Sequence, residues 1–342
     1  MKAFSEASVQ AFSRRRFIGS ASALAAVSLL GGSPTAEAEP PPETKKIRFV
    51  HVPAICLAPQ YVAEALLRAE GFSEIEYVEI ANNTGYNALA DGRADLTQSS
   101  APDLVVGLDG GGDVISLAGV HVGCYELFVH PNISTIRELK GKRAAITGMR
   151  STEHVFLSSI VAYVGMDPRK DIEWVIAGSA AEAMELFVRG KVDAFLAFAP
   201  QPQELREKRA GRVILNTAQD RPWAQYFCCL LAARQEFVRE NPVATKRVLR
   251  AVLKAADICA QDPEGAARYL VEKGFEPRYE TALDVLKSLP FRRWRETEPE
   301  DTLRFHALRL RDVGMITSSP QKIISGGTDW RFLNELKREL KV

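Results

Sequence analysis

The chain has 342 residues, 46% of them hydrophobic, and a formal net charge of +1 at pH 7. This length and composition allow a substantial core and two domains, and they exclude a disordered or fibrous protein. The balanced charge gives no electrostatic basis for attraction to nucleic acid or to anionic lipid, so a charged ligand has to be met by local groups.

The amino terminus has the features of an export signal. The segment SRRRFI at residues 13–18 precedes an apolar, alanine-rich run at 19–30 and the triplet Ala-Glu-Ala at 36–38. Paired arginines before a short apolar region and a small-residue cleavage site indicate the twin-arginine route. We therefore predict a signal peptide over residues 1–38 and a periplasmic protein. Residues 39–46 contain three successive prolines and are predicted to form a disordered leader.

The next stretch predicts a strand, a helix and a second strand. Residues 46–52 alternate into an apolar strand that stops at Pro53. A helix is expected over 59–69, with Pro59 in its first turn, and a strand over 75–80.

A polar cluster follows the third predicted strand. A short helix at 85–90 ends at Asp91-Gly92, a strong turn signal, and a strand is expected over 94–97. Gln98, Ser99 and Ser100 come directly after it, before a helix running through Leu108. Ligands of alternating β-α-β sheets bind beyond the carboxyl ends of the strands, so these three residues are candidate ligand contacts.

This region carries a resemblance to a known family. The segment ALADGRADLTQSSAPDL at residues 88–104 resembles the solute-binding proteins of nitrate/sulfonate/taurine-type ABC importers, and the similarity extends over nearly all of the chain after the signal peptide. The resemblance implies a type II periplasmic binding protein, in which two three-layer α/β domains are joined by two crossing strands. In that family the first ligand loop follows the first strand, which makes Cys56, Leu57 and Ala58 candidate contacts.

Two features mark the end of the first half. The run Gly110-Gly111-Gly112 lacks the residues of a phosphate-binding loop and is predicted to be a helix end and turn. A strand is expected over 113–122, with His121 near its end as a further candidate contact. Residues 126–130 form the predicted crossing into the second domain.

A second candidate site lies at the start of the helix predicted over 155–164. Ser151 or Thr152 is a suitable N-cap, and the free amides of a helix start attract anions, with Arg150 adding a cation. Residues 162–172, AYVGMDPRKDI, also resemble the sulfonate-binding family, whose glycine-serine helix start touches the anionic group of the ligand. Here Met149 and Arg150 stand between Gly148 and Ser151, so the residue that donates remains open.

The second half repeats the unit of the first. Strands are expected over 172–176 and 192–197, and GKVDAFL at 190–196 repeats the pattern of DGRADL at 91–96. Phe198 follows the latter strand as a candidate contact. The apolar run 223–233 is predicted to be the returning crossing strand, with Trp223 and Tyr226 either bordering the ligand or packing between the domains. Helices dominate thereafter. The predicted domains are 47–130 with 227–342, and 131–226.

The five cysteines have no C-x-x-C spacing. Cys56, Cys124, Cys228, Cys229 and Cys259 are therefore predicted to be small buried apolar residues, and no metal or cofactor is expected. One disulfide is possible, but the sequence does not name its pair.

The family resemblance and the export signal together predict the solute-binding subunit of an ABC importer. Such a subunit is expected to be a monomer without enzymatic activity that passes a solute to a membrane permease. Arg150 favours an anionic group, and the apolar candidates favour an organic body, so a sulfonate or carboxylate is expected. The alternatives are a thiamine-pyrimidine precursor-binding protein or synthase-like enzyme, and a sensor subunit that presents its ligand to a membrane kinase. The pair Cys228-Cys229 and His51 suggest the enzyme only weakly, and no hydrolase motif is present.

Overall fold

The computed structural model describes residues 39–80 and 85–340, so the predicted signal peptide lies outside the described residues. The chain from Pro40 onward forms one compact unit with two five-stranded sheets. No helix within the described ranges combines the length and apolar composition needed to cross a membrane.

The first sheet has the strand order β2-β1-β3-β10-β4. β1 is parallel to β2 and β3, whereas β10 is antiparallel to its neighbours β3 and β4. Its strands are β1 (Lys46–His51), β2 (Glu74–Glu79), β3 (Leu96–Ser100), β4 (Val114–Val122) and β10 (Phe227–Arg234).

The second sheet repeats this arrangement with the order β7-β6-β8-β5-β9. β6 is parallel to β7 and β8, and β5 is antiparallel to β8 and β9. Its strands are β5 (Tyr125–Val129), β6 (Lys142–Ile146), β7 (Ile172–Ile176), β8 (Ala194–Phe198) and β9 (Arg212–Asn216). The second sheet thus consists of the consecutive strands β5 to β9, and β10 returns after them to the first sheet.

Helices cover both faces of each sheet. Those that alternate with the strands are α1 (Ala58–Val62), α2 (Glu64–Ala69), α3 (Gly85–Ala90), α4 (Ala101–Asp109), α5 (Thr152–Tyr163), α6 (Pro168–Asp171), α7 (Ala180–Val188) and α8 (Gln201–Glu207). Those that follow β10 are α9 (Gln235–Glu240), α10 (Pro242–Gln261), α11 (Pro263–Glu272), α12 (Tyr279–Ser288), α13 (Pro299–Asp312), α14 (Pro320–Gly327) and α15 (Arg331–Glu339).

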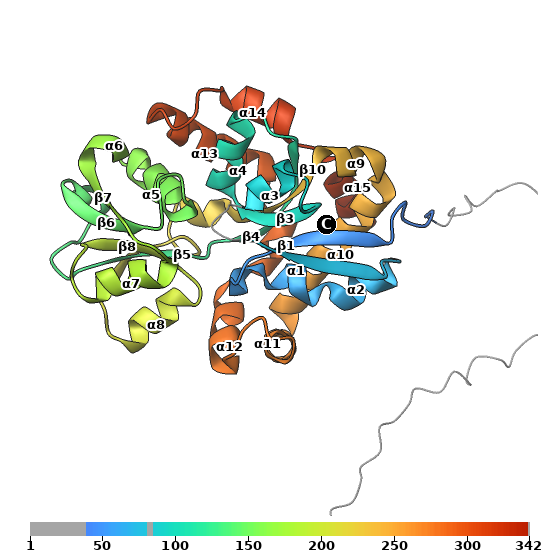
Figure 1. The fold of residues 1–342 in the computed structure, drawn as a ribbon, viewed down its shortest axis with the longest axis horizontal. Coiled ribbons are helices and arrows are strands. Elements are labelled where there is room, and N and C mark those ends of the chain that lie inside the picture. The colour runs from blue at the N-terminus through green and yellow to red at the C-terminus, as the bar shows by residue number, and fades with distance from the viewer. Residues whose placement is uncertain (1–38, 81–84, 341–342) are drawn as a thin grey trace, which may run out of the picture. The chain divides into compact units, whose positions relative to one another are not determined.

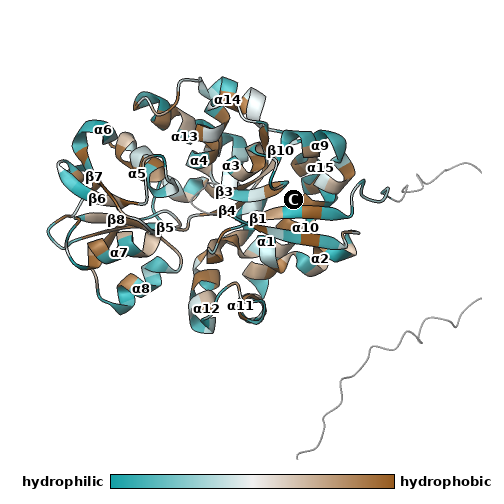
Figure 2. Ribbon diagram, in the orientation of Figure 1, coloured by the Kyte–Doolittle hydropathy of each residue, from teal (hydrophilic) through white to brown (hydrophobic). Residues whose placement is uncertain are grey.

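The layers are visible in Figure 1, where α5 and α6 lie on one face of the second sheet and α7 and α8 on the other. In Figure 2 the strands β1 and β2 alternate between brown and teal, and outer helices such as α8 and α9 carry much teal. The buried apolar residues are sequestered where helices meet sheets, and this burial is the main favourable term in folding.

An Arg–Asp pair recurs at the same place in both sheets. In the first, the backbone amide and guanidinium of Arg48 in β1 donate to Asp95, just before β3. In the second, Arg143 in β6 donates in the same way to Asp193, just before β8. The repeated sequence pattern of the two halves thus encodes the same link between parallel strands.

Two crossing segments join the sheets, and they are tied to each other. The Thr217 hydroxyl accepts hydrogen bonds from the amides of Cys124 and Tyr125 and donates to the Tyr125 carbonyl. Gly123 has a φ of +65°, and a β-carbon there would lie 2.3 Å from the α-carbon of Ala218. The segments approach so closely that only glycine fits at this position.

Several elements differ from their predicted extents by a few residues, and three of the differences affect the site or the crossing segments. β3 runs through Ser100, so Gln98, Ser99 and Ser100 form the end of the strand and do not follow it. The helix predicted over 59–69 is divided into α1 and α2 at Ala63. The backbone of Ala63 itself has a right-handed helical conformation. Residues 223–225 form a short 3-10 helix, because the Trp223 side chain packs into an aromatic cluster before β10 begins.

The residues before β1 make specific contacts with α10. These contacts differ from the disordered leader that the sequence predicts for residues 39–46. The Glu43 carboxylate accepts hydrogen bonds from the amides of Val243 and Ala244, at the first turn of α10. A carboxylate at this position is favourable because the first amides of a helix lack intrahelical partners.

Candidate functional site

A cavity of about 240 Å³ lies where the carboxyl ends of strands from both sheets meet, and we call it the chamber. The chamber is lined by Val52, Ala54, Cys56, Leu57, Ile80, Gly85, Gln98, Ser99, Ser100, Asp103, Cys124, Tyr125, Thr147, Thr152, Glu153, Ala180, Phe198 and Cys229. A wider hollow of about 1070 Å³, the cleft, shares Asp103, Thr147 and Ala180 with it and is also lined by Arg150 and Ser151.

The first sheet supplies a polar wall at the end of β3. The side-chain amide of Gln98 donates to the Leu57 carbonyl at 3.2 Å, which fixes the 3-10 helix Ile55–Leu57 beside β3. The Gln98 carbonyl oxygen is buried and has no hydrogen-bond partner among the described residues. The Ser100 hydroxyl caps α4 by accepting from the amide of Asp103.

The second sheet contributes the start of α5. The Thr152 hydroxyl donates to Asp103 at 2.6 Å, so this hydrogen bond joins a helix of each sheet across the chamber. The second oxygen of Asp103, Oδ1, has no hydrogen-bond partner within the part of the chain that the structure describes. The carboxylate of Glu153 accepts from the amide and the hydroxyl of Thr147.

The local turn that precedes α5 fixes Arg150. Its backbone has a φ of +70°, a conformation that is unfavourable for a residue with a side chain. Its amide donates to Nδ1 of His154 at 2.9 Å, and Ser151 caps the helix by accepting from the amide of His154. Burial lowers the pKa of His154 and so favours the neutral ring that accepts this bond. The exposed Arg150 is thereby placed at the wall of the cleft.

The charges of the two hollows differ. Among the described residues, those lining the chamber include the acids Asp103 and Glu153 and no lysine, arginine or histidine. Burial raises the pKa of Asp103 to about 7, although the Thr152 and Ser100 hydroxyls oppose this shift. The Gln98 oxygen therefore suits a group that donates a hydrogen bond, Asp103 can accept or donate near neutral pH, and the cleft offers the cation Arg150.

Thiol groups converge at one wall of the chamber. Cys56, Cys124 and Cys229 line it, and Sγ of Cys228 lies 2.8 Å from Sγ of Cys124. Hydrogen bonds from the thiols of Cys124, Cys228 and Cys56 lower the pKa of Cys229. Burial alone raises the pKa of Cys259, which lies apart in α10.

The structure places the predicted contacts in three groups. Cys56, Leu57, Gln98, Ser99, Ser100, Thr152 and Phe198 line the chamber, and Arg150 and Ser151 line the cleft. Ala58 and His121 are fully buried outside both linings. Trp223 and Tyr226 border a separate, much smaller cavity, where both rings pack against Phe305. Their geometry favours packing between segments over contact with a ligand.

Several lining residues lacked a clear signal in the sequence. Asp103 stands in the first turn of α4, three residues after the capping Ser100, and this spacing could have drawn attention to it. Cys124 and Cys229 could not be found in this way, because separate segments of the chain bring them together.

Two similar α/β sheets, joined by two crossing segments and enclosing a cavity at their strand ends, define a periplasmic binding protein fold. Residues 58–266, more than half of the chain, match the family described as NMT1/THI5 like. The chain therefore belongs to the NMT1/THI5-like family.

Solved structures agree with this assignment of the fold. The periplasmic nitrate-binding protein NrtA from Synechocystis PCC 6803 superposes with a TM-score of 0.73 at 18% identity, covering 88% of this chain and 90% of that one. The alkanesulfonate-binding protein SsuA from Xanthomonas axonopodis pv. citri, bound to MOPS, gives 0.64 at 19% identity, with coverages of 82% and 96%. SsuA from Escherichia coli gives 0.64 at 16%, with coverages of 82% and 92%. No curated protein matches the chain by sequence. The family resemblance and the fold class predicted from sequence are both confirmed.

Proposed function

We propose that this protein is the extracytoplasmic solute-binding subunit of an ABC importer, which captures a small solute by hinge closure and delivers it to a membrane permease. The observation that carries the proposal is the chamber, whose walls come from both sheets and are joined by the Asp103–Thr152 hydrogen bond. A solute between two α/β units that are linked by two crossing segments favours their closed arrangement. The similar structures include a nitrate-binding and an alkanesulfonate-binding protein, which supports this function.

The solute we propose is a small organic anion, a sulfonate or carboxylate, that also donates hydrogen bonds. Arg150 and the capped start of α5 favour the anionic group in the cleft. Leu57 and Phe198 offer apolar contact in the chamber. The unpartnered oxygens of Gln98 and Asp103 favour hydrogen-bond donors, such as an amine, on the body of the solute.

A thermal-shift screen of the protein lacking residues 1–38 tests this function. Taurine should be compared with alkyl sulfonates of equal length that lack the amine, and both with nitrate, bicarbonate, aromatic carboxylates and pyrimidines. A ligand at 100 times its dissociation constant stabilises a fold by about 2.7 kcal/mol, which raises the melting temperature by a few degrees. A shift with an aminated anion, without turnover, supports the proposal. The absence of a shift with every compound contradicts it.

The Arg150→Ala variant tests the role of the cation. Removing a charge-assisted hydrogen bond costs about 1.5–3 kcal/mol, so affinity for the anion found in the screen should fall by at least about 10-fold. Calorimetric titration measures this change, and Arg189→Ala, which removes an exposed arginine paired with Glu185 in α7, is the matched control. Unchanged affinity in Arg150→Ala would rule out charge pairing at this position.

We further propose that the protein is exported by the twin-arginine route, resides in the periplasm and works as a monomer. The arginine pair Arg14-Arg15 ahead of the apolar run supports the export route. Replacing Arg14 and Arg15 by lysine should retain the protein in the cytoplasm, as cell fractionation measures.

The precursor-binding or synthase-like enzyme is a second candidate, because thiols line the chamber and the family description includes the THI5-like proteins. A thermal shift with a pyrimidine, but with no anion, would favour this candidate.

A further inference from the structure

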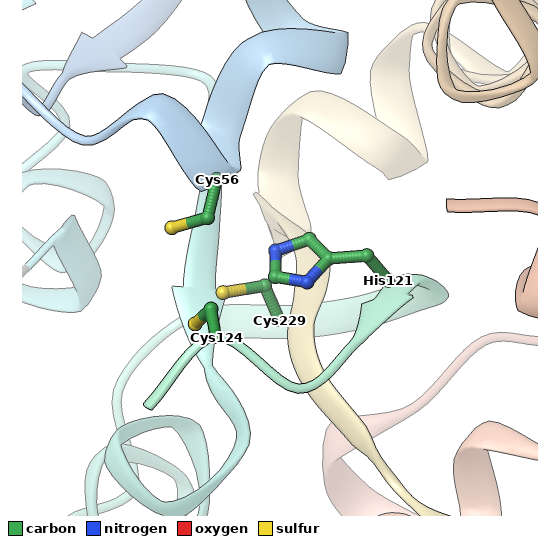
Figure 3. Close-up of side chains that lie close together, drawn as sticks. All are labelled: Cys56, His121, Cys124 and Cys229. Carbon is green, nitrogen blue, oxygen red and sulfur yellow. The ribbon is translucent and has the colours of Figure 1, made fainter. Parts of the chain in front are cut away.

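Four buried side chains with metal-binding atoms meet beside the chamber, as Figure 3 shows. They are Cys56 in the 3-10 helix after β1, His121 in β4, Cys124 in the crossing segment and Cys229 in β10. One sulfur or ring nitrogen from each lies within 4.8 Å of all the others. The exposed fraction of each residue is 7% or less.

The histidine is oriented as a metal ligand. Its Nδ1 lies 2.9 Å from the carbonyl oxygen of Gly123, which can only accept, so Nδ1 carries the proton and Nε2 presents a lone pair. Nε2 is fully buried, and no group in residues 39–80 and 85–340 forms a hydrogen bond with it. A ring nitrogen held by a backbone carbonyl, with its other nitrogen free, is the arrangement that metal-ligating histidines adopt.

The register of the strands places Cys229 directly opposite this histidine. Cys229 is paired with His121 in the β4–β10 ladder, and the register shifts on both sides of Cys229. Such irregularities redirect side chains and are frequent near functional sites. The segment His121-x-x-Cys124 supplies two further donors from one short stretch that turns at Gly123.

We propose that Cys56, His121, Cys124 and Cys229 bind one thiophilic metal ion, for which Zn²⁺ is the reference. Three thiolates and one imidazole are an established tetrahedral donor set for zinc. Zinc–sulfur bonds of about 2.3 Å place the sulfurs of a tetrahedron roughly 3.8 Å apart. The present separations, at most 4.8 Å, therefore require a contraction of about 1 Å or less.

The metal site extends beyond the proposed solute function and does not depend on it. The ion is held by one sheet and the crossing segment, because Cys124 directly follows Gly123 between β4 and β5. Metal binding therefore fixes one of the two crossing segments, and, because three thiolates outweigh the divalent ion, it leaves one net negative charge at the thiol wall of the chamber. The absence of C-x-x-C spacing hid this site in the sequence, since its ligands come from three separate stretches of the chain.

Elemental analysis of the purified full-length chain tests the proposal. The protein is prepared under reducing conditions, incubated with Zn²⁺ and dialysed, and one equivalent of zinc per chain is expected to remain. X-ray absorption at the zinc edge should show three sulfur neighbours at about 2.3 Å and one nitrogen at about 2.0–2.1 Å. This spectrum needs no variant, so it decides the ligand set even where a substitution prevents folding.

Variants then assign the ligands. Cys229→Ser and His121→Ala should each lose stoichiometric zinc, and in the cobalt-loaded protein they should lose the sulfur-to-metal absorption. Cys259→Ser removes a buried thiol outside the cluster and should retain one equivalent. Cys228→Ser should retain it as well.

Three results would overturn the proposal. They are wild-type protein without retained zinc, a spectrum with only oxygen and nitrogen neighbours, and a native Cys124–Cys228 disulfide, which would remove Cys124 as a ligand. Zinc is measured without any solute, so a failed metal site leaves the solute screen intact, and a failed screen leaves the zinc result intact.

Discussion

Two buried hydrogen-bond acceptors on the walls of the chamber have no partner among the described residues. They are Oε1 of Gln98 and Oδ1 of Asp103. An unsatisfied buried polar atom costs about 1–3 kcal/mol, so such atoms are uncommon unless a ligand or water satisfies them. The arrangement therefore favours a bound solute with donors over an empty chamber.

Asp103 should make the stability of the protein depend on pH. Its folded-state pKa of about 7 lies above the ordinary aspartate value, so the folded protein keeps a proton that the unfolded chain releases. The stabilisation is fully present below about pH 4 and is lost as pH rises to about 7. Asp103→Asn should flatten this decline, as urea unfolding between pH 5 and 8 would measure.

Asp167 provides the control for this pH experiment. It caps α6, and its hydrogen bond with Arg169 lowers its pKa, so it remains charged throughout this range. Asp167→Asn should therefore change stability by the same amount at every pH from 5 to 8. Equal pH slopes for Asp103→Asn and the wild type would contradict the assignment to Asp103.

The crossing segments are the elements on which the proposed closure depends. They are joined by the three hydrogen bonds of Thr217, and the backbones meet at Gly123 and Ala218. Hinges absorb their conformational change in a few residues at the ends of elements. The segment around Gly123 has this position, because it separates β4 from β5.

Gly123→Ala should destabilise the protein more than other substitutions of glycines with positive φ. A left-handed alanine costs about 1–2 kcal/mol, and the added methyl would also collide with the backbone of Ala218. Gly141 has a φ of +69° and open space around it, so Gly141→Ala carries only the first cost. Denaturant unfolding compares the two, and equal losses would show that the segments separate freely.

The whole molecule is closed across the chamber by the hydrogen bond between Asp103 of α4 and Thr152 of α5. Each of these helices belongs to a different sheet, so the hydrogen bond can form only when the two approach. A ligand that binds the closed arrangement has an apparent affinity set by the population of that arrangement.

Thr152→Val should therefore weaken solute binding. The loss of this hydrogen bond, worth about 1.5 kcal/mol, should reduce affinity about 10-fold and increase the radius of gyration without ligand. Titration calorimetry and small-angle scattering measure the two effects. Thr135→Val removes a hydroxyl that bonds only Glu138 at the surface and should change neither. Unchanged affinity together with unchanged scattering in Thr152→Val would exclude this closure contact.

The sequence by itself determined the local elements, the repeated unit and the family. Alternating apolar residues, the turns at Asp91-Gly92 and Gly190 and the N-cap at Ser151 act over a few positions, so they can be read along the chain. The polar end of β3 was found for the same reason, although the strand extends through Ser100.

Only the tertiary structure decided which side chains share one site. Asp103 and Thr152 are 49 positions apart, and Cys124 and Cys228 are 104 apart, yet both pairs are in contact. The tertiary structure also separates Trp223 from the site. Its ring packs against aromatic residues of α13 and α5 and does not line the chamber. Local patterns fix the elements because their interactions span one turn or one strand, whereas the crossing of two strands between the sheets brings distant residues together.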